Sequence, residues 1–133
     1  MNTWERFERA LQGRRVWIRR REQDWLLNFG DGNFIVVEAV WRLSDGQKIL
    51  LTDTDDGHQF GLPAPVNAEA RANELLSGGM VTSVNANNVT ADLDIQFSHG
   101  IRLEVLTNST GYESWQGYSN GELVEVGVNG WRL

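Results

Sequence analysis

The sequence predicts an α+β fold in which two repeated units, each made of one helix and several antiparallel strands, share one domain. The first observation is that two apolar helical stripes end in similar segments, Leu11-Gln12-Gly13 and Leu76-Ser77-Gly78. The second is that apolar and polar residues alternate after each helix, as they do in half-buried strands. The third is a polar turn with glycine near the end of each unit, at Asp45-Gly46 and Asn120-Gly121.

We expect the two units to span residues 1–52 and 67–133, joined by a loop at residues 53–66. A unit of about 65 residues would bury too little apolar surface to be stable alone, so residues 1–133 are expected to form a single domain. A helix that covers one face of a sheet fits strands of alternating polarity. The spacing leaves three arrangements open: a strongly curved sheet, two sheets, or a partly open barrel, each with two helices.

The first helix is expected to follow Thr3, whose hydroxyl can cap it. Trp4, Phe7 and Leu11 form an apolar stripe on one face of this helix, and Gly13 is a natural stop. Beyond Gly13 the period changes to two, and glycine-containing turns separate the apolar runs. The strands of this unit are expected at residues 16–18, 25–29, 34–37, 40–43 and 49–51.

The second unit repeats this order of elements. Asn67 is expected to cap a helix over Ala68–Leu76, and Gly78-Gly79 ends that helix. The segment before it, residues 52–66, holds both prolines and several aspartates and glycines, which is typical of a loop. The strands of this unit are expected at residues 80–84, 91–97, 101–106, 114–118 and 123–128.

Composition excludes several classes of function. The chain has no cysteine, which excludes disulfides, thiolate zinc sites and a cysteine nucleophile. Its net charge of -6 argues against nucleic acid as the main partner and suits a basic protein partner. We expect a cytoplasmic protein without membrane contact, because the sequence contains neither a signal-peptide pattern nor an apolar run of membrane-spanning length.

Arginine is concentrated near the start of the chain. Alternation places these side chains on both faces of a strand and its turn, which weakens the case for a single anion-binding patch. We expect instead a solvated edge strand that its charge protects from aggregation. The residues concerned are Arg14, Arg15, Arg19, Arg20 and Arg21.

No catalytic, cofactor or metal site is predicted. The acidic segment Asp53-Thr54-Asp55-Asp56-Gly57 resembles a calcium loop only superficially, because its glycine and the later glutamate position do not fit the EF-hand spacing. His58 and His99 are the only histidines and form no ligand-spaced pair. The sequence also contains no Gly-x-Ser-x-Gly elbow. The acidic loop is therefore interpreted as a docking surface for a basic partner.

The segment Tyr112-Glu113-Ser114-Trp115-Gln116 is rich in side chains that recognition surfaces favour. Two interpretations stay open for it. Either Trp115 fills the core beneath a helix, as Trp41 would in the first unit, or the aromatic side chains contact a partner. The candidate partner-binding residues are Asp53, Asp55, Asp56, Tyr112, Glu113 and Trp115.

The stretch from Leu93 to Val105, followed by Tyr112-Glu113-Ser114-Trp115, resembles a family of small uncharacterised bacterial proteins. These proteins share a strand, a Phe-x-x-Gly turn, a second strand and a Tyr-Glu-Ser-Trp signature. Some of them resemble immunity proteins, which neutralise polymorphic toxins in the producing cell, so the resemblance implies that role here. The chain departs from the family's glycine-rich end at Gly127-Val128-Asn129-Gly130-Trp131.

The leading functional hypothesis is a non-catalytic binding protein that neutralises a partner toxin by occlusion, and the charge of the chain favours a basic toxin domain. The alternative is a small-ligand-binding module with a tryptophan-lined pocket between the two repeats. A third hypothesis is a hydrolase built from Asp, Glu and His, including His58 or His99. Oligomeric state is left open by the sequence.

Overall fold

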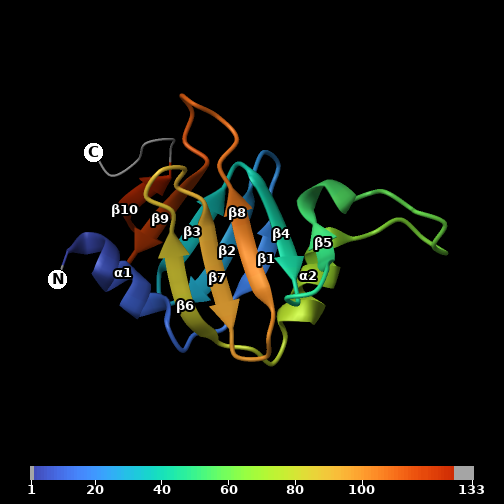
Figure 1. The fold of residues 1–133 in the computed structure, drawn as a ribbon, viewed down its shortest axis with the longest axis horizontal. Helices are drawn as coiled ribbons and strands as arrows, with labels where there is room; N and C mark the ends of the chain where they lie inside the picture. Colours follow the sequence, from blue (N-terminus) through green and yellow to red (C-terminus); the bar gives the residue numbers. More distant parts are fainter. Residues whose placement is uncertain (1, 128–133) are drawn as a thin grey trace.

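The computed structural model describes residues 2–127. Within them it contains two α-helices and ten strands, arranged in two five-stranded antiparallel sheets (Figure 1). The α+β prediction is confirmed. Of the three arrangements that the sequence left open, the structure has the two separate sheets, and neither closes into a barrel within the described residues.

All the predicted helices and strands are present, with small shifts at their ends. The predicted last strand, residues 123–128, is described as far as Gly127, and Val128-Asn129-Gly130-Trp131 lies outside the described residues. The elements are α1 (Thr3–Leu11), β1 (Trp17–Arg20), β2 (Trp25–Gly30), β3 (Asn33–Val37), β4 (Val40–Ser44), β5 (Ile49–Thr52), the 3-10 helix η1 (Asp53–Asp55), α2 (Ala68–Leu76), β6 (Val81–Ala86), β7 (Leu93–Phe97), β8 (Arg102–Leu106), β9 (Trp115–Ser119) and β10 (Glu122–Gly127).

The two sheets have matching strand orders. Sheet A runs β1-β2-β3-β9-β10, and sheet B, read from its other edge, runs β6-β7-β8-β4-β5. If each of the strands β1–β5 is replaced by the strand five places later, and each of β6–β10 by the strand five places earlier, the order of sheet A becomes the order of sheet B. Each half of the chain therefore gives three strands to one sheet and its last two strands to the other. This interlocked order is what a duplicated unit with exchanged terminal hairpins would produce.

The helices lie at opposite sides of the two-sheet body (Figure 1). α1 packs against β9 and β10 of sheet A and β6 of sheet B, whereas α2 packs against β1 of sheet A and β5 of sheet B. The inner faces of the sheets carry the core, in which Trp41 and Trp115 are fully buried. Each is paired with a second tryptophan, Trp25 with Trp41 and Trp4 with Trp115. No helix of the described part of the chain is long and apolar enough to cross a membrane.

Asparagine caps both helices. Asn67 Oδ1 accepts a hydrogen bond of 3.0 Å from the Ala70 N–H, as predicted for α2. The predicted cap of α1 was wrong by one residue, because Asn2 Oδ1 accepts from the Glu5 N–H at 2.8 Å and Thr3 is already helical. Asparagine is the stronger capping residue of the two, which explains the shift.

The arginine-rich strand β1 forms an edge of sheet A, as expected. Its alternation is also confirmed, because Ile18 is buried while Trp17 and Arg19 are exposed. Asn73 of α2 protects this edge with hydrogen bonds to both the N–H and the C=O of Ile18, each 2.8 Å long. These two bonds satisfy peptide groups that an added strand would otherwise use.

Candidate functional site

The outer face of sheet A carries neighbouring apolar side chains, which we call the aromatic face. Trp17 lies opposite Asn28 in the strand register, Phe34 lies opposite both Asn28 and Tyr118, and Leu123 lies opposite Tyr118. A second row crosses the same strands beside this one. The aromatic face is defined as Trp17, Leu26, Phe34, Val36, Tyr118, Leu123 and Val126.

The two ends of the aromatic face are open to solvent, whereas Val36 within it is buried and the other members are half-buried. Trp17 is 63% exposed and Leu123 is 55% exposed, at the two ends of one row. Between them, the rings of Phe34 and Tyr118 stack with their centroids 4.6 Å apart. Neither helix covers this face, because α1 and α2 lie at the sides of the sheets. An uncovered patch of this kind is typical of a protein-interaction site.

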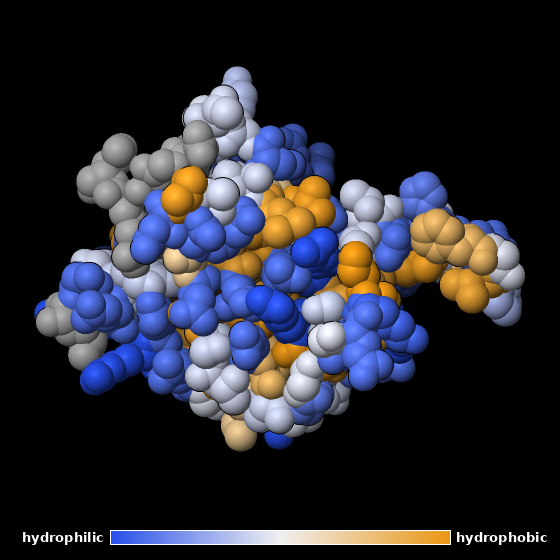
Figure 2. All heavy atoms as spheres, viewed as in Figure 1, coloured by the Kyte–Doolittle hydropathy of each residue, from blue (hydrophilic) through white to orange (hydrophobic). Residues whose placement is uncertain are grey.

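The outer face of sheet B is polar. Asp94, Glu104 and Arg42 lie side by side across β7, β8 and β4, and Gln96, Arg102 and Ser44 form the next row. Arg102 binds Asp94 through two hydrogen bonds of 2.6 and 2.8 Å. Arg42 Nε donates to Glu104 at 3.1 Å. Figure 2 shows this face, with hydrophilic residues running across its middle.

The strand registers of the two sheets match position by position. In sheet A, Leu26 pairs with Val36 and Val36 with Gln116; in sheet B, Asp94 pairs with Glu104 and Glu104 with Arg42. Four of the six equivalent positions given next carry an apolar or aromatic residue in sheet A and a charged or small polar residue in sheet B, whereas Gln116/Arg42 and Asn28/Gln96 are polar in both. The pairs, with the residue of sheet A first, are Leu26 and Asp94, Val36 and Glu104, Gln116 and Arg42, Asn28 and Gln96, Phe34 and Arg102, and Tyr118 and Ser44.

Trp115 is not a surface residue, which corrects its place among the candidate partner-binding residues. Its side chain is 0% exposed, and its ring nitrogen Nε1 donates to the Ala91 carbonyl at 2.8 Å. The ring of Trp4, from α1, packs against it at 5.8 Å between centroids. The first of the two interpretations from the sequence, a core residue beneath a helix, is the one that the structure shows.

Tyr112 and Glu113 lie at the surface beside the aromatic face. Tyr112 is 82% exposed. Gln116, which belongs to the outer face of sheet A, donates from Nε2 to Glu113 at 3.2 Å and to Glu38 at 2.8 Å. Both candidates are therefore accessible, and Glu113 adjoins the outer face of sheet A through Gln116.

Two aspartates of the acidic loop have structural partners. Asp55 Oδ2 accepts from the Thr52 N–H at 2.9 Å, at the start of η1. Asp56 accepts from the first N–H of α2, at Ala68, and forms an ion pair with Arg20 of β1. Both carboxylates thus hold the loop in place, which weakens their assignment as free steering charges.

Asp53 differs from its two neighbours. Its Oδ1 is buried and has no hydrogen-bond partner among residues 2–127. Burial raises the pKa of this carboxyl group, and the backbone N–H groups of Trp41 and Thr54 oppose that increase only in part. A carboxylate with one unpaired buried oxygen is costly in a folded chain.

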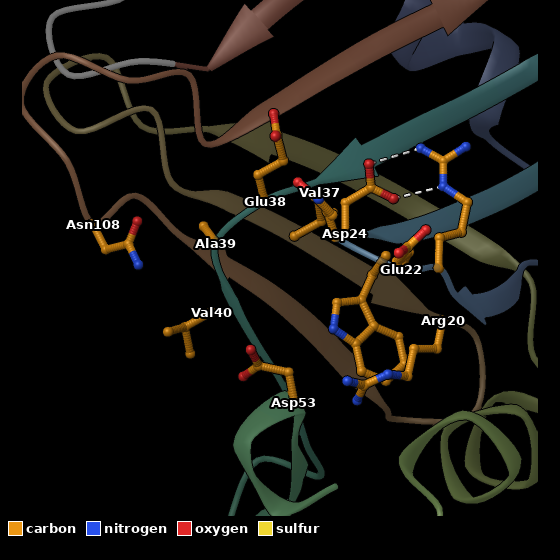
Figure 3. A pocket seen from close by; sticks show the side chains of 12 residues that line it. Arg20, Glu22, Asp24, Val37, Glu38, Ala39, Val40, Asp53 and Asn108 are labelled. Atoms are coloured by element: carbon orange, nitrogen blue, oxygen red, sulfur yellow. Dashed lines mark hydrogen bonds and ion pairs between the residues drawn. The ribbon is translucent and has the colours of Figure 1, made fainter.

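Asp53 lines a cavity of about 290 Å³ at one end of the sheets (Figure 3). The wall comes from the β1–β2 turn, the connection between β3 and β4, η1, and the segment that follows β8. Trp25 is the one tryptophan of this lining, and Asn108 is its one residue from the second unit. The lining residues are Arg20, Arg21, Glu22, Gln23, Asp24, Trp25, Val37, Glu38, Ala39, Val40, Asp53 and Asn108.

The predicted loop forms an arm between η1 and α2. It projects from the body of the protein (Figure 1), and its base is closed by hydrogen bonds from Gly57 N–H to Val66 O and from Val66 N–H to His58 O. Phe60 is 66% exposed and stacks on the His58 ring. The arm therefore carries a second, smaller exposed apolar surface, which Figure 2 shows as a hydrophobic projection.

The histidines take part in packing and local hydrogen bonds. His99 Nε2 lies 2.9 Å from the Leu75 carbonyl oxygen, and His58 stacks on Phe60. No group of three or more His, Cys, Asp or Glu side chains that could hold a metal ion occurs within residues 2–127.

Sequence reasoning missed the aromatic face, although a signal was present. The run Phe34-Ile35-Val36-Val37 is apolar at every position, whereas the equivalent strand Arg102-Leu103-Glu104-Val105 alternates. A continuous apolar strand indicates burial on both faces. Neither helix covers its outer face, yet Val36 on that face is only 8% exposed, so neighbouring side chains of the sheet supply part of this burial.

The match to known proteins extends over nearly the whole chain. The family of unknown function DUF6188 matches residues 7–130, which include both halves of the interlocked sheets. The chain belongs to this family. No curated protein and no solved structure matches the chain.

Proposed function

We propose that this DUF6188 protein is a non-catalytic module that binds a protein partner through the aromatic face, and that it neutralises a toxin by occlusion, as an immunity protein does. The binding role is supported by residues of the described structure. The immunity role is supported by the resemblance carried by Tyr112-Glu113-Ser114-Trp115 and is the more specific part of the proposal.

The observation that carries the proposal is the difference between equivalent positions of the two sheets. Sheet B shows that the fold tolerates a charged outer face, because Asp94, Arg102 and Glu104 occupy its centre. Stability of the free protein therefore does not require Phe34 or Leu26 at the matching positions of sheet A. Half-buried stacked aromatic side chains, such as Phe34 and Tyr118, are instead favoured where a partner excludes the remaining water from them.

The charge of the chain suits a basic partner. A net charge of -6 attracts a cationic protein at long range and raises the rate of encounter. Glu38 and Glu113 lie at the margin of the aromatic face, both bonded to Gln116. A partner with basic residues around an apolar centre would match this surface, since charged rims surround apolar centres in many interfaces.

Occlusion needs no reacting group on this chain. An immunity protein of this kind would cover the active surface of a toxin in the cytoplasm of the producing cell. Each buried aromatic anchor at the centre of such an interface contributes about 2 kcal/mol or more to binding. Phe34 and Tyr118 are the central pair in this surface.

Co-expression with the product of the adjacent gene tests the proposal. We expect the two proteins to co-purify, and we expect this chain to restore growth when that product is toxic. Phe34→Ala is expected to weaken both effects, while Gln96→Ala on the outer face of sheet B leaves them unchanged. If Gln96→Ala is as damaging as Phe34→Ala, the aromatic face is not the binding surface. If neither co-purification nor growth rescue occurs, the immunity role is wrong.

A further inference from the structure

We propose that the tip of the arm enters an apolar cleft of the protein partner, with Phe60 as the side chain that fills the cleft and Leu62 beside it. The arm is residues 57–66, between η1 and α2. This inference rests on the proposed function, because it takes the partner to be the basic toxin whose active surface is covered. It adds a second contact, distinct from the aromatic face.

The arm is exposed over nearly its whole length. Residues 57–65 are exposed and Val66 is half-buried, and Figure 1 shows the segment projecting away from the two sheets. None of its residues is Asp, Glu, Lys or Arg. A narrow, uncharged projection with apolar side chains at its tip is complementary in shape and polarity to an apolar cleft.

The tip is held in shape by its own hydrogen bonds. The Leu62 N–H donates to the Gln59 carbonyl oxygen at 2.8 Å, and Gln59 Nε2 donates to the Leu62 carbonyl oxygen at 2.8 Å. Pro63 and Pro65 follow directly and restrict the backbone further. A loop that is ordered before it binds loses little conformational entropy in the complex.

The base of the arm is fixed to the body of the protein. Asp56 accepts a hydrogen bond of 2.9 Å from the Ala68 N–H, at the start of α2, and forms an ion pair with Arg20 of β1. Asp55 accepts from the Thr52 N–H, at the end of β5. The direction in which the tip points is therefore set in the free protein.

Phe60 is an unfavourable residue for the turn at the tip. The φ angles of Phe60 and Gly61 are +49° and +74°, as in a type I′ turn. Two hairpin turns of the same chain have nearly the same angles, with +54° and +77° at Asp31-Gly32 and +53° and +77° at Asn120-Gly121. Asp and Asn tolerate the left-handed conformation, whereas a bulky side chain rarely adopts it. The folding of the arm therefore does not explain a phenylalanine at this position.

Core packing does not explain Phe60 either. Its side chain is 66% exposed, and its ring stacks on the ring of His58, another exposed residue of the arm, at 5.5 Å between centroids. Leu62 is 49% exposed beside it. An aromatic ring that fills a pocket of a partner is a common centre of binding energy, and the cleft would remove both side chains from water.

The charge at the base of the arm indicates the rim of the cleft. Asp53, Asp55 and Asp56 lie within η1 and directly after it, and Arg20 forms an ion pair with Asp56. The apolar tip is thus followed by an acidic base. A basic protein with an apolar cleft and basic groups around the opening is complementary to both parts.

Replacing Phe60 by the residue that the chain uses at position 120 tests the inference. Phe60→Asn keeps a residue that suits the turn, so we expect the full chain to unfold at or above the wild-type temperature. We expect its affinity for the product of the adjacent gene to fall at least about tenfold. Val89→Asn is the matched control, because Val89 is 72% exposed in the connection between β6 and β7. This control should change the affinity less than twofold.

Several outcomes would overturn the inference. A lower unfolding temperature of Phe60→Asn would show, without any partner, that the ring serves the fold. Wild-type affinity of Phe60→Asn, with weakened binding by Phe34→Ala, would exclude the arm and leave the proposed function in place. Equal losses of affinity in Phe60→Asn and Val89→Asn would show that the effect is not specific to the arm. If the wild-type chain forms no complex, the proposed function is wrong and this inference falls with it.

Photo-cross-linking tests the shape of the partner's site. With p-benzoylphenylalanine in place of Phe60, irradiation of the complex is expected to join position 60 to partner residues that line a cleft needed for toxicity. The same replacement at Val89 should give no cross-link to the partner. Cross-links from position 60 to a flat outer surface of the partner would contradict insertion of the tip.

Discussion

The outer faces of the two sheets show how one arrangement of strands can serve two purposes. Both faces have the same strand order and register, yet Leu26, Phe34 and Tyr118 stand where sheet B has Asp94, Arg102 and Ser44. Sheet B shows that this arrangement of strands can carry a charged outer face with internal ion pairs. The departure of sheet A from that pattern is the observation on which the proposed binding surface rests.

The largest effect is expected from giving sheet A the chemistry of sheet B. The double variant L26D/F34R places an aspartate and an arginine where Asp94 and Arg102 form their ion pair. The fold should persist, and binding of the partner should weaken by about 100-fold or more, because two anchors of about 2 kcal/mol each are lost. Isothermal titration calorimetry measures the affinity, and circular dichroism checks the fold.

Two outcomes of this experiment would contradict the comparison between the two outer faces. If L26D/F34R unfolds, the apolar side chains of sheet A are needed for stability and the two faces are not equivalent. If it folds and binds with wild-type affinity, the aromatic face is not the interface.

Giving sheet B the chemistry of sheet A is expected to make its outer face promote self-association. The variant D94L/R102F removes the ion pair and exposes a new apolar patch, which should increase self-association relative to the wild-type protein. Analytical ultracentrifugation over a range of concentrations measures this change. Unchanged self-association would mean that apolar character on this fold does not by itself promote binding.

Tyr118 of sheet A and the equivalent Ser44 of sheet B allow the two outer faces to be compared at a single position. Tyr118→Ala is expected to weaken partner binding about 30-fold, the equivalent of about 2 kcal/mol. Its counterpart on sheet B, Ser44→Ala, should change the affinity less than twofold. Similar effects of the two substitutions would place the interface elsewhere.

The sequence predicted the local elements well because their signals are local. The second helix was predicted over its full extent from Asn67 and Gly78-Gly79, and hairpins followed from glycine turns. The cap of the first helix was misplaced because Asn2 and Thr3 can both cap and only their relative strength separates them. The exchange of terminal hairpins between sheets was not predictable, since a turn fixes which strands pair and not which sheet receives them.

The candidate site was predicted only in part. Tyr112 and Glu113 are at the surface, but Trp115 is in the core because β9 begins there and α1 places Trp4 against it. The aromatic face required the register between β3 and β9, which joins residues far apart in the sequence.

The smallest expected effects are on the pH dependence of stability. They come from two carboxylates at the margins of the sheets, and they have opposite signs. Burial raises the pKa of Asp53, which also faces Asp55 and the charged lining of the cavity, so its ionisation costs stability as pH rises above the unfolded pKa of 3.8. Backbone N–H groups of Gln47 and Lys48 lower the pKa of Asp45, in the β4–β5 turn. Its stabilising contribution is present above that unfolded value and is lost as pH falls through the folded pKa.

Comparing unfolding temperatures at pH 7 and pH 3 separates the two groups. Asp45→Asn should be less stable than the wild-type protein at pH 7 and should approach it at pH 3. Asp53→Asn should be at least as stable as the wild-type protein at pH 7, and any advantage should vanish at pH 3. A destabilised Asp53→Asn at pH 7 would show that this carboxylate serves the fold.

Methyl cross-saturation NMR on the complex with the product of the adjacent gene maps the contact surface most directly. The expected result is strong saturation of the methyl groups of Leu26, Val36 and Leu123, on sheet A, with little at Thr82 and Leu106, on sheet B. Strong saturation confined to the residues of sheet B would contradict the central claim that the aromatic face is the binding surface.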